Sequence, residues 1–345
     1  MKDVTNAIPG ATGEQPTKLG AASLVQQVRE RLGDVVAQAA AAGALVVVFI
    51  ILTFISPSFL TANNLTNVIE QTTVTAIIAI GMTFVIITAG IDLSVGSTAA
   101  ISGVVGVSLM VYHGMNWPLA VLLGTLVGAT VGLGNGLLIT FGNLNPFIAT
   151  LGMQGVIRGL DYIWTNGKVV FGVPQGFGVL GSGQVAGIPV ALMILIFVSV
   201  IAYLLLSRTR LGRYTYAIGS NQEAARLSGI PITNYKIAVY VILGLLAGFG
   251  GMIASSRVYS GQPNFGLGLE LDVIAAAVIG GASLFGGQGT IIGTLIGAFL
   301  IALIRNGSVL LDINSFYQEV IIGVVIWLAV FWDQFRRKRM TSVSS

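Results

Sequence analysis

Two aspartates stand out among the few side chains of this sequence that have acid–base or ligand-binding chemistry. Asp92 and Asp272 each introduce an apolar stretch. One interpretation is helix capping, in which the carboxylate accepts amide hydrogen bonds at the start of a helix. The other is that both carboxylates line a polar path, because an ionisable group within an apolar layer is costly and is kept for function. The sequence leaves both interpretations open.

The motifs of common catalytic centres are missing from the sequence. It contains no Gly-x-x-x-x-Gly-Lys-Ser/Thr phosphate loop, no His-Glu-x-x-His and no Gly-x-Ser-x-Gly. It also has no cysteine, which excludes disulfides and thiolate chemistry, and its single histidine, His113, falls in a short connection. We therefore predict that the chain is not an enzyme and binds no cofactor or metal.

Charged side chains are concentrated in one polar segment, residues 207–233, which holds four arginines. Within it, Asn221 can cap a short helix over Gln222 to Leu227, and Gly229 can end that helix. Glu223 and Arg226 have the spacing of an ion pair on one helix face. The plain alternative is a solvated loop. The sequence Glu223-Ala224-Ala225, followed after three residues by Gly229, resembles the short helix by which permeases of ATP-binding-cassette importers dock on their ATPase. The docking residues that this resemblance implies are Ser220, Asn221, Glu223, Ala224, Ala225, Arg226 and Gly229.

The rest of the chain has the composition of a membrane protein. Of its 345 residues 54% are hydrophobic and 9% are charged, and the mean hydropathy is +0.89. Charged residues this scarce cannot cover a water-facing exterior, so a lipid bilayer is the expected surrounding. The formal charge of +4 forms no continuous basic face, which argues against nucleic acid as a partner.

Apolar runs punctuated by glycine, proline and asparagine predict an all-α polytopic protein with ten spans. The predicted domains are a cytoplasmic tail (1–34), a membrane domain (35–333) and a second cytoplasmic tail (334–345). The eighth and ninth spans are expected to be short and broken by glycines, a pattern that lipid tolerates only around a cavity or inside protein. The spans are 35–55, 68–89, 93–111, 119–139, 146–163, 188–206, 235–253, 273–284, 291–304 and 316–332.

Lysine and arginine near the span ends predict the orientation. Basic clusters precede the first span, fill the 207–233 loop and follow the last span. An even number of spans places all three clusters on one side, which the positive-inside rule makes cytoplasmic. We therefore expect a multi-pass protein of the cell inner membrane with both termini in the cytoplasm. Charges inside the spans are few, and Arg158 with Asp161 are spaced to pair on one helix.

Internal symmetry and close helix packing are two further expectations. The segments Gly90 to Leu93 and Leu269 to Asp272 each open a span on opposite sides, as in an inverted repeat, although chance similarity explains so short a match equally well. Glycines at every fourth position of residues 124–136 allow close helix contact, either within one chain or between two copies. Glycine pairs at 244 and 248, and at 293 and 297, repeat this spacing.

Several ordered stretches identify a resemblance. They include Gly81 to Thr83, Gly90 to Ser97, Pro146 to Leu151, Thr209 to Tyr214 and the 217–230 loop, followed by 261–263, 270–272, 280–281 and 289–290. Together they span 59–329 and resemble the ribose-type sugar permeases in the family that also contains branched-chain amino-acid permeases. The Ile-x-Leu-Pro ending found after the docking motif in other importers is absent after Gly229.

The resemblance implies a permease subunit of an ATP-binding-cassette importer. Its implied partners are a separate ATPase that binds ATP and magnesium, an external sugar-binding protein and a second permease, which we expect to be identical. Residues 165–187 and 258–269 are candidate external docking loops or plain connections. A neutral sugar needs hydroxyl and amide partners. The predicted pathway residues are Asp92, Ser94, Ser97, Asn145, Gln154, Glu270 and Asp272.

Other functions are less compatible with these observations. An ion-coupled carrier needs titratable groups within its spans and no docking helix, and a passive channel has no use for a docking sequence. Within the importer class, a branched-chain amino acid, a nucleoside or a sugar-like signal are alternative cargoes. The expected mechanism is alternating access, in which closure of the ATPase dimer pushes on residues 220–229 and rocks two permeases.

Overall fold

The structure is a computed structural model that describes residues 38–341, most of which are helical. The predicted tail over 1–34 lies outside the described residues, and the last helix continues through most of the predicted tail from 334. The long helices are α1 (Gln38–Ile55), α2 (Ala62–Ile87), α3 (Val95–His113), α4 (Trp117–Thr140), α5 (Pro146–Thr165), α7 (Val190–Arg208), α10 (Ile232–Arg257), α12 (Ile291–Leu310) and α13 (Ser315–Thr341).

Shorter elements complete the fold. Between α5 and α7 lie β1 (Val170–Phe171), a 3₁₀ helix (Gln175–Gly178), α6 (Val179–Ser182), β2 (Gln184–Val185) and β3 (Ile188–Pro189). After α7 come α8 (Arg210–Ser220) and α9 (Gln222–Leu227), and after α10 come β4 (Ser260–Gly261) and α11 (Leu269–Ile279).

Seven helices of the described chain are long and apolar enough to cross a membrane, namely α1, α2, α3, α4, α7, α10 and α12. The other three predicted spans coincide with α5, α11 and α13. Helix α5 has 20 residues but contains Arg158 and Asp161, α11 has 11 residues, and the apolar part of α13 is Ser315–Leu328. The all-α membrane class is confirmed, whereas the count of ten spans stays a prediction.

The ninth predicted span is not short or broken, contrary to the prediction. Helix α12 runs without interruption for 20 residues, and Gly293 and Gly297 lie inside it. A Cβ at Gly297 would lie 2.9 Å from the carbonyl carbon of Ala276 in α11, so these glycines serve close packing. The eighth span is short as predicted, because α11 ends at Ile279 and an irregular connection with several positive-φ glycines follows.

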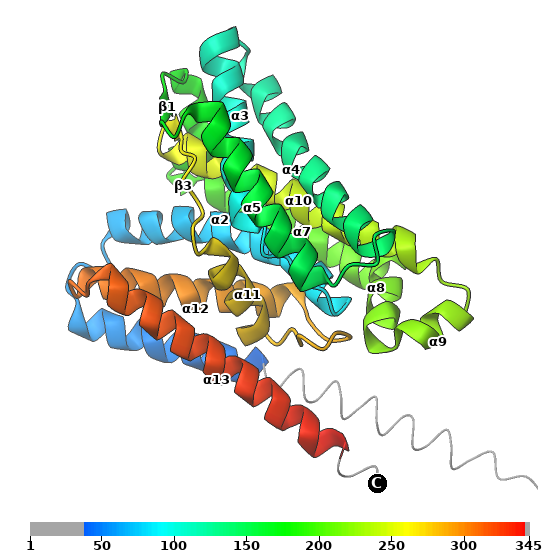
Figure 1. The fold of residues 1–345 in the computed structure, drawn as a ribbon. Helices are drawn as coiled ribbons and strands as arrows, with labels where there is room; N and C mark the ends of the chain where they lie inside the picture. Colours follow the sequence, from blue (N-terminus) through cyan, green and yellow to red (C-terminus); the bar gives the residue numbers. More distant parts are fainter. Residues whose placement is uncertain (1–37, 342–345) are drawn as a thin grey trace, which may run out of the picture.

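Helix α10 lies at the centre of the bundle, packed against α2, α3 and α4 (Figure 1). The glycines of α4 face it: a Cβ at Gly128 would approach the Cα of Gly248 to 2.7 Å, and one at Gly132 would approach the Cα of Gly244 to 3.1 Å. The glycine spacing in both helices is therefore used within one chain rather than in a seam between two copies.

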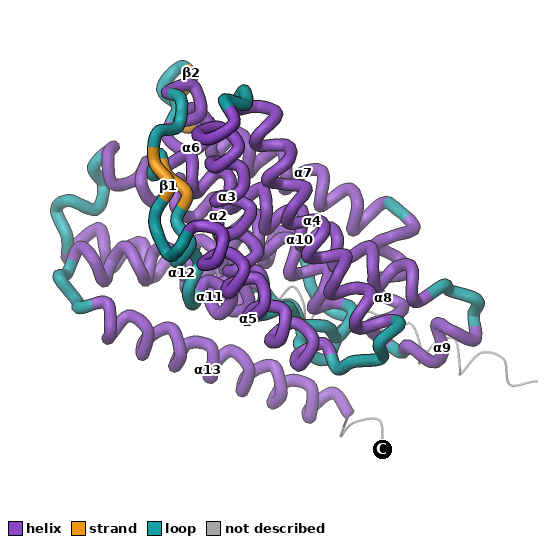
Figure 2. Tube along the Cα trace, turned by 45° about the horizontal axis from the view of Figure 1, so that its top comes forward, coloured by secondary structure: helices purple, strands orange, loops and turns teal. Residues whose placement is uncertain are grey.

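The two ends of the bundle differ in structure. Helices α8 and α9 project at one end, which we call the α9 end, and the short strands gather at the other, the strand end (Figure 2). There β1 pairs with β4, and β2 pairs with β3, both antiparallel. Because α10 runs from α9 to β4, it connects the two ends directly.

Candidate functional site

Local sequence builds the short helix α9 as predicted. The side-chain oxygen of Asn221 accepts a hydrogen bond from the amide of Ala224 at 2.9 Å. After the helix, Gly229 has a φ of 79°, a left-handed conformation that glycine adopts without strain, and the amide of Ile230 donates to the carbonyl of Ala225. These two caps define a helix of six residues that stands apart from the bundle.

The predicted docking residues lie together on the surface of α9 and its flanks, with Ala225 buried beneath them. Glu223 and Arg226 form the predicted ion pair, with 64% and 66% of their side chains exposed. The hydrogen bond from Arg226 lowers the pKa of Glu223, so this carboxylate stays ionised at neutral pH. Leu227 is 79% exposed, an unusual position for a large apolar side chain on so short a helix. Helix α9 thus presents a mixed charged and apolar surface.

Helices α8 and α9 are attached to the bundle through a few defined contacts. The hydroxyl of Tyr216 donates to the carbonyl of Gly289 at 2.6 Å, and Gly219 packs directly on the backbone at Ile87. From α9, the side chain of Gln222 accepts a hydrogen bond from Lys236 at 2.7 Å. The bond between Gln222 and Lys236 thus connects α9 directly to α10.

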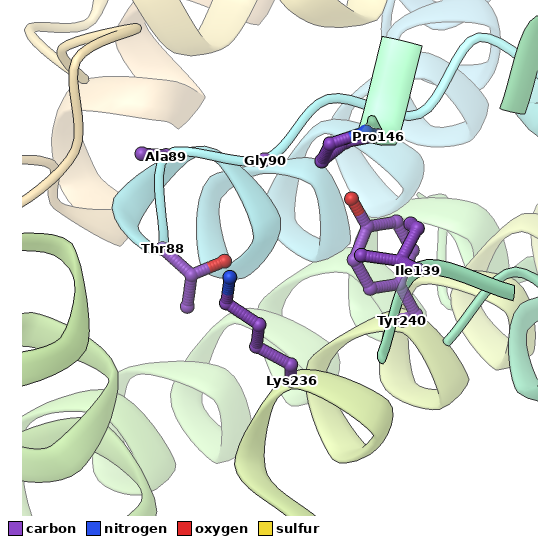
Figure 3. A pocket seen from close by; sticks show the side chains of 7 residues that line it. All are labelled: Thr88, Ala89, Gly90, Ile139, Pro146, Lys236 and Tyr240. Atoms are coloured by element: carbon purple, nitrogen blue, oxygen red, sulfur yellow. The ribbon is translucent and has the colours of Figure 1, made fainter. Parts of the chain in front are cut away.

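Lys236 and Tyr240 lie one turn apart on α10, and both line a small cavity of about 10 Å³ (Figure 3). The cavity is also lined by Thr88, Gly90 and Pro146 and is the size of one water molecule. The hydroxyl of Tyr240 donates to the carbonyl of Ile91 at 3.2 Å. The Lys236–Tyr240 face of α10 therefore joins α9 to the connection between α2 and α3, residues 88–94.

Asp92 lies in this connection and is 2% exposed. It accepts hydrogen bonds from the amide and the hydroxyl of Ser94, at 2.8 and 2.6 Å, and from the side-chain amide of Asn135 in α4 at 2.9 Å. The amide of Leu93 donates to Thr150 of α5 at 3.1 Å. Asp92 accepts a hydrogen bond from one backbone amide, as a capping residue does. The N-cap residue of α3 is nevertheless Ser94 and not Asp92. Neutral hydrogen-bonding partners from its own turn, from α4 and from α5 thus hold the connection.

Asp272 has entirely different partners at the strand end. It lies in the first turn of α11, where Gly268 is the N-cap residue, so it is not a cap. Both of its oxygens accept hydrogen bonds from Arg305 of α12 at 2.9 Å. Arg305 also reaches Glu319 of α13 at 3.3 Å. The ion cluster joins three helices.

The remaining predicted pathway residues fall into separate places. Gln154 donates to Glu270 at 3.1 Å, which brings α5 and α11 together. The hydroxyl of Ser97 donates to the carbonyl of Ser94, and Asn145 caps α5 through the amide of Phe147. The seven residues therefore do not line one open cavity.

The sequence reasoning missed several partners. Asn135, Thr150 and Tyr240 hold the connection around Asp92, and Glu70 forms an ion pair with Arg257 at 3.2 Å. A polar residue within an apolar helix was the available signal. The expected pairing of Arg158 with Asp161 is wrong, because Arg158 donates instead to the carbonyls of Pro263 and Phe265.

Comparison with known proteins identifies the family. Residues 64–330 match the model described as "Branched-chain amino acid transport system / permease component". The chain belongs to this permease family. The match covers most of the chain, including nearly all of α2 and the whole of α3 to α12.

Proteins similar to this permease have names that specify a cargo. The ribose import permease proteins of Escherichia coli (strain K12) and Bacillus subtilis (strain 168) are 46% and 45% identical, each over 84% of this chain, covering 91% and 90% of those proteins. The D-allose transport system permease protein of E. coli (strain K12) is 39% identical over 81% of this chain and 86% of that protein. These similarities confirm the resemblance to ribose-type sugar permeases. No solved structure matches the chain.

Proposed function

We infer that this permease is the membrane-spanning subunit of an ATP-driven importer of a monosaccharide, working with a separate ABC ATPase, an external sugar-binding protein and a second copy of itself. The observation that carries this proposal is α9, a capped, six-residue helix whose charged and apolar surface is exposed outside the bundle. The relatives' names, ribose, D-allose and L-arabinose, support a sugar as cargo.

The mechanism that we propose is alternating access, driven from the ATPase through α9. Helix α9 bonds to Lys236, and Tyr240 on the same face of α10 bonds to the 88–94 connection. Movement of α9 is thereby transmitted to the network around Asp92, which closes the α9 end when the ATPase dimer closes and the pore opens toward the binding protein. ATP and magnesium act on the ATPase, and this chain supplies the movement and the path.

For the binding protein we propose the strand end as the docking face. Most of residues 166–188 are exposed there, including Phe171 at 67% and Val185 at 56%. The second candidate loop, 258–269, is a weaker choice, because Ser260 and Gly261 are buried and pair with β1. We assign both chain termini and α9 to the cytoplasm and the strand end to the outside, following the basic clusters.

The test is ATP-dependent uptake of D-ribose by liposomes that contain the permease, its ABC ATPase and the ribose-binding protein. Glu223→Ala and Arg226→Ala are expected to reduce both co-purification of the ATPase and uptake. Gln184→Ala, an exposed change at the strand end, is the matched control for ATPase binding. Uptake that proceeds without the ATPase, driven by an ion gradient, would overturn the proposal. ATP-driven uptake of leucine or a nucleoside in place of sugars would reassign the cargo.

A further inference from the structure

One face of α5 carries a continuous row of polar side chains, which we call the α5 stripe: Thr150, Gln154, Arg158, Asp161 and Thr165. The spacing of four, four, three and four residues places them on one side of the helix. At a rise of about 1.5 Å per residue the stripe is roughly 22 Å long, most of the apolar thickness of a bilayer. Thr150 and Asp161 are fully buried, and Thr165 is 8% exposed. A polar row of this length runs along the helix against neighbouring protein.

The α5 stripe touches three segments that are far apart in sequence. Thr150 bonds to the 88–94 connection, Gln154 to Glu270 in α11, and Arg158 to the carbonyls of Pro263 and Phe265 at 2.6 and 2.8 Å. These contacts extend from the Asp92 network to the segment between β4 and α11. The stripe therefore connects the two ends of the bundle.

Part of this polar surface has unused hydrogen-bonding capacity. Both carboxylate oxygens of Asp161, one guanidinium nitrogen of Arg158 and the second oxygen of Glu270 are buried without a hydrogen-bond partner in the described residues. Asp161 and Arg158 form no ion pair in this part of the chain, although they lie three residues apart. Burying an unpaired carboxylate is costly, and within a membrane such groups mark substrate paths.

The cover over the α5 stripe is built from residues 258–268. It contains two glycines with positive φ, Gly266 and Gly268, and it packs on Gly96 of α3. Arg158 holds it through backbone carbonyl oxygens alone, and the hydroxyl oxygens of a ligand can accept the same bonds. On its other side α5 is open: a Cβ at Gly152, Gly155 or Gly159 would meet no atom within 4 Å. Helix α5 is therefore unpacked on the side away from its cover.

We propose that the α5 stripe, with Glu270, is the surface along which the permease binds the imported monosaccharide, and that residues 258–268 cover it in the closed state. This inference rests on the proposed function and deepens it. Each sugar hydroxyl both donates and accepts a hydrogen bond. The free oxygens of Asp161 and Glu270 accept from such hydroxyls, and the free nitrogen of Arg158 donates to them. A neutral polyhydroxylated ligand therefore satisfies every unpaired group.

The absence of cysteine from the chain gives a direct test, since each introduced cysteine is the only one. Thr165→Cys and Gln154→Cys are placed in the complete complex with the ATPase and binding protein, and labelled with a charged methanethiosulfonate reagent. Labelling is expected to be slow without ATP, faster during ATP turnover, and slowed again by D-ribose. Ser58→Cys, exposed in the connection between α1 and α2 and outside every proposed docking surface, is the control that labels equally under all three conditions.

The inference would be overturned if the labelling rate at both stripe positions is the same with and without ATP and D-ribose, in a complex that still imports ribose. Thr165→Cys is nearly isosteric, so it keeps the test informative when Gln154→Cys folds poorly. If the native complex imports no sugar, the proposed function fails instead. The two failures are therefore distinguishable.

Transport by side-chain variants tests the chemistry separately. Asp161→Asn and Arg158→Gln are expected to lower D-ribose uptake per ATP hydrolysed by roughly tenfold or more, as lost bonds to a charged group predict. They are also expected to change the preference among D-ribose, D-allose and L-arabinose, whereas ATPase co-purification stays unchanged. Tyr162→Phe removes a hydroxyl that has no hydrogen bond in the described structure and is the matched control. Unchanged uptake and preference in both variants would contradict a binding role.

Discussion

Asp92 and Asp272 are both buried acids near the start of a helix, but their surroundings have opposite character. Asp92, near the α9 end, receives hydrogen bonds from Ser94 and Asn135, which are neutral. Asp272, toward the strand end, faces the guanidinium of Arg305, which is shared with Glu319. The first carboxylate holds a backbone connection in one geometry, and the second balances charge between three helices.

This difference indicates that the Asp92 site is suited to movement and the Asp272 site to stability. The donors to Asp92 come from its own turn and from α4, and Tyr240 ties the same connection to α10. Small shifts of α10 therefore change the Asp92 site directly. The guanidinium of Arg305 has two carboxylate partners, so it tolerates rearrangement but not removal, because removal leaves a buried unpaired charge.

The largest effect is expected from Arg305→Gln. Asp272 has 9% of its side chain exposed, and loss of its cation leaves its charge unpaired. We expect a loss of about 3 kcal/mol in the free energy of unfolding, measured by denaturant titration of the purified permease. The double variant Asp272→Leu with Arg305→Leu should recover most of the loss. If Arg305→Gln alone is as stable as the native chain, the charge of Asp272 is not balanced by Arg305.

The second-largest effect is expected at the Asp92 site, where the hydrogen-bond donors are neutral. Asn135→Leu removes a donor to both Asp92 and Ser94 and leaves the buried carboxylate with an unsatisfied oxygen. The expected cost is about 2 kcal/mol in the same titration. Thr130→Val, an exposed change on the same helix, should be neutral. If Asn135→Leu costs more than Arg305→Gln, the ranking of the two sites is reversed.

A smaller loss of stability is expected from Tyr240→Phe. The change removes only the hydroxyl that donates to the carbonyl of Ile91 at 3.2 Å, so the cost should be about 1 kcal/mol. Uptake per ATP should fall by more than this small loss of stability accounts for, because the bond links α10 to the 88–94 connection. Asn234→Ala, exposed on the same helix, is the control. Unchanged uptake per ATP would exclude this route of transmission.

The smallest effect is expected from Glu319→Gln. Its side chain is 56% exposed and 3.3 Å from Arg305, and exposed ion pairs contribute little. The free energy of unfolding should change by less than about 0.5 kcal/mol, and the difference should disappear at high salt. A cost close to that of Arg305→Gln would mean that Glu319, rather than Asp272, is the main partner of Arg305.

Structural features that depend on residues close together in the sequence were predictable. The apolar runs gave helices close to their observed bounds, and the Asn221 cap, the Gly229 ending and the Glu223–Arg226 pair of α9 depend only on residues within one or two turns. The family resemblance was equally readable, because it rests on short ordered motifs.

Three-dimensional packing alone decided the partners of the buried polar groups. Asn135 reaches Asp92 across 43 residues, Arg305 reaches Asp272 across 33, and Arg158 reaches the carbonyl of Pro263 across 105. Packing also decided that the glycines of α4 face α10 and that those of α12 leave the helix unbroken. The physical reason is that helix formation depends on neighbouring residues, whereas the satisfaction of a buried charge or a close helix contact depends on which distant backbone happens to lie opposite.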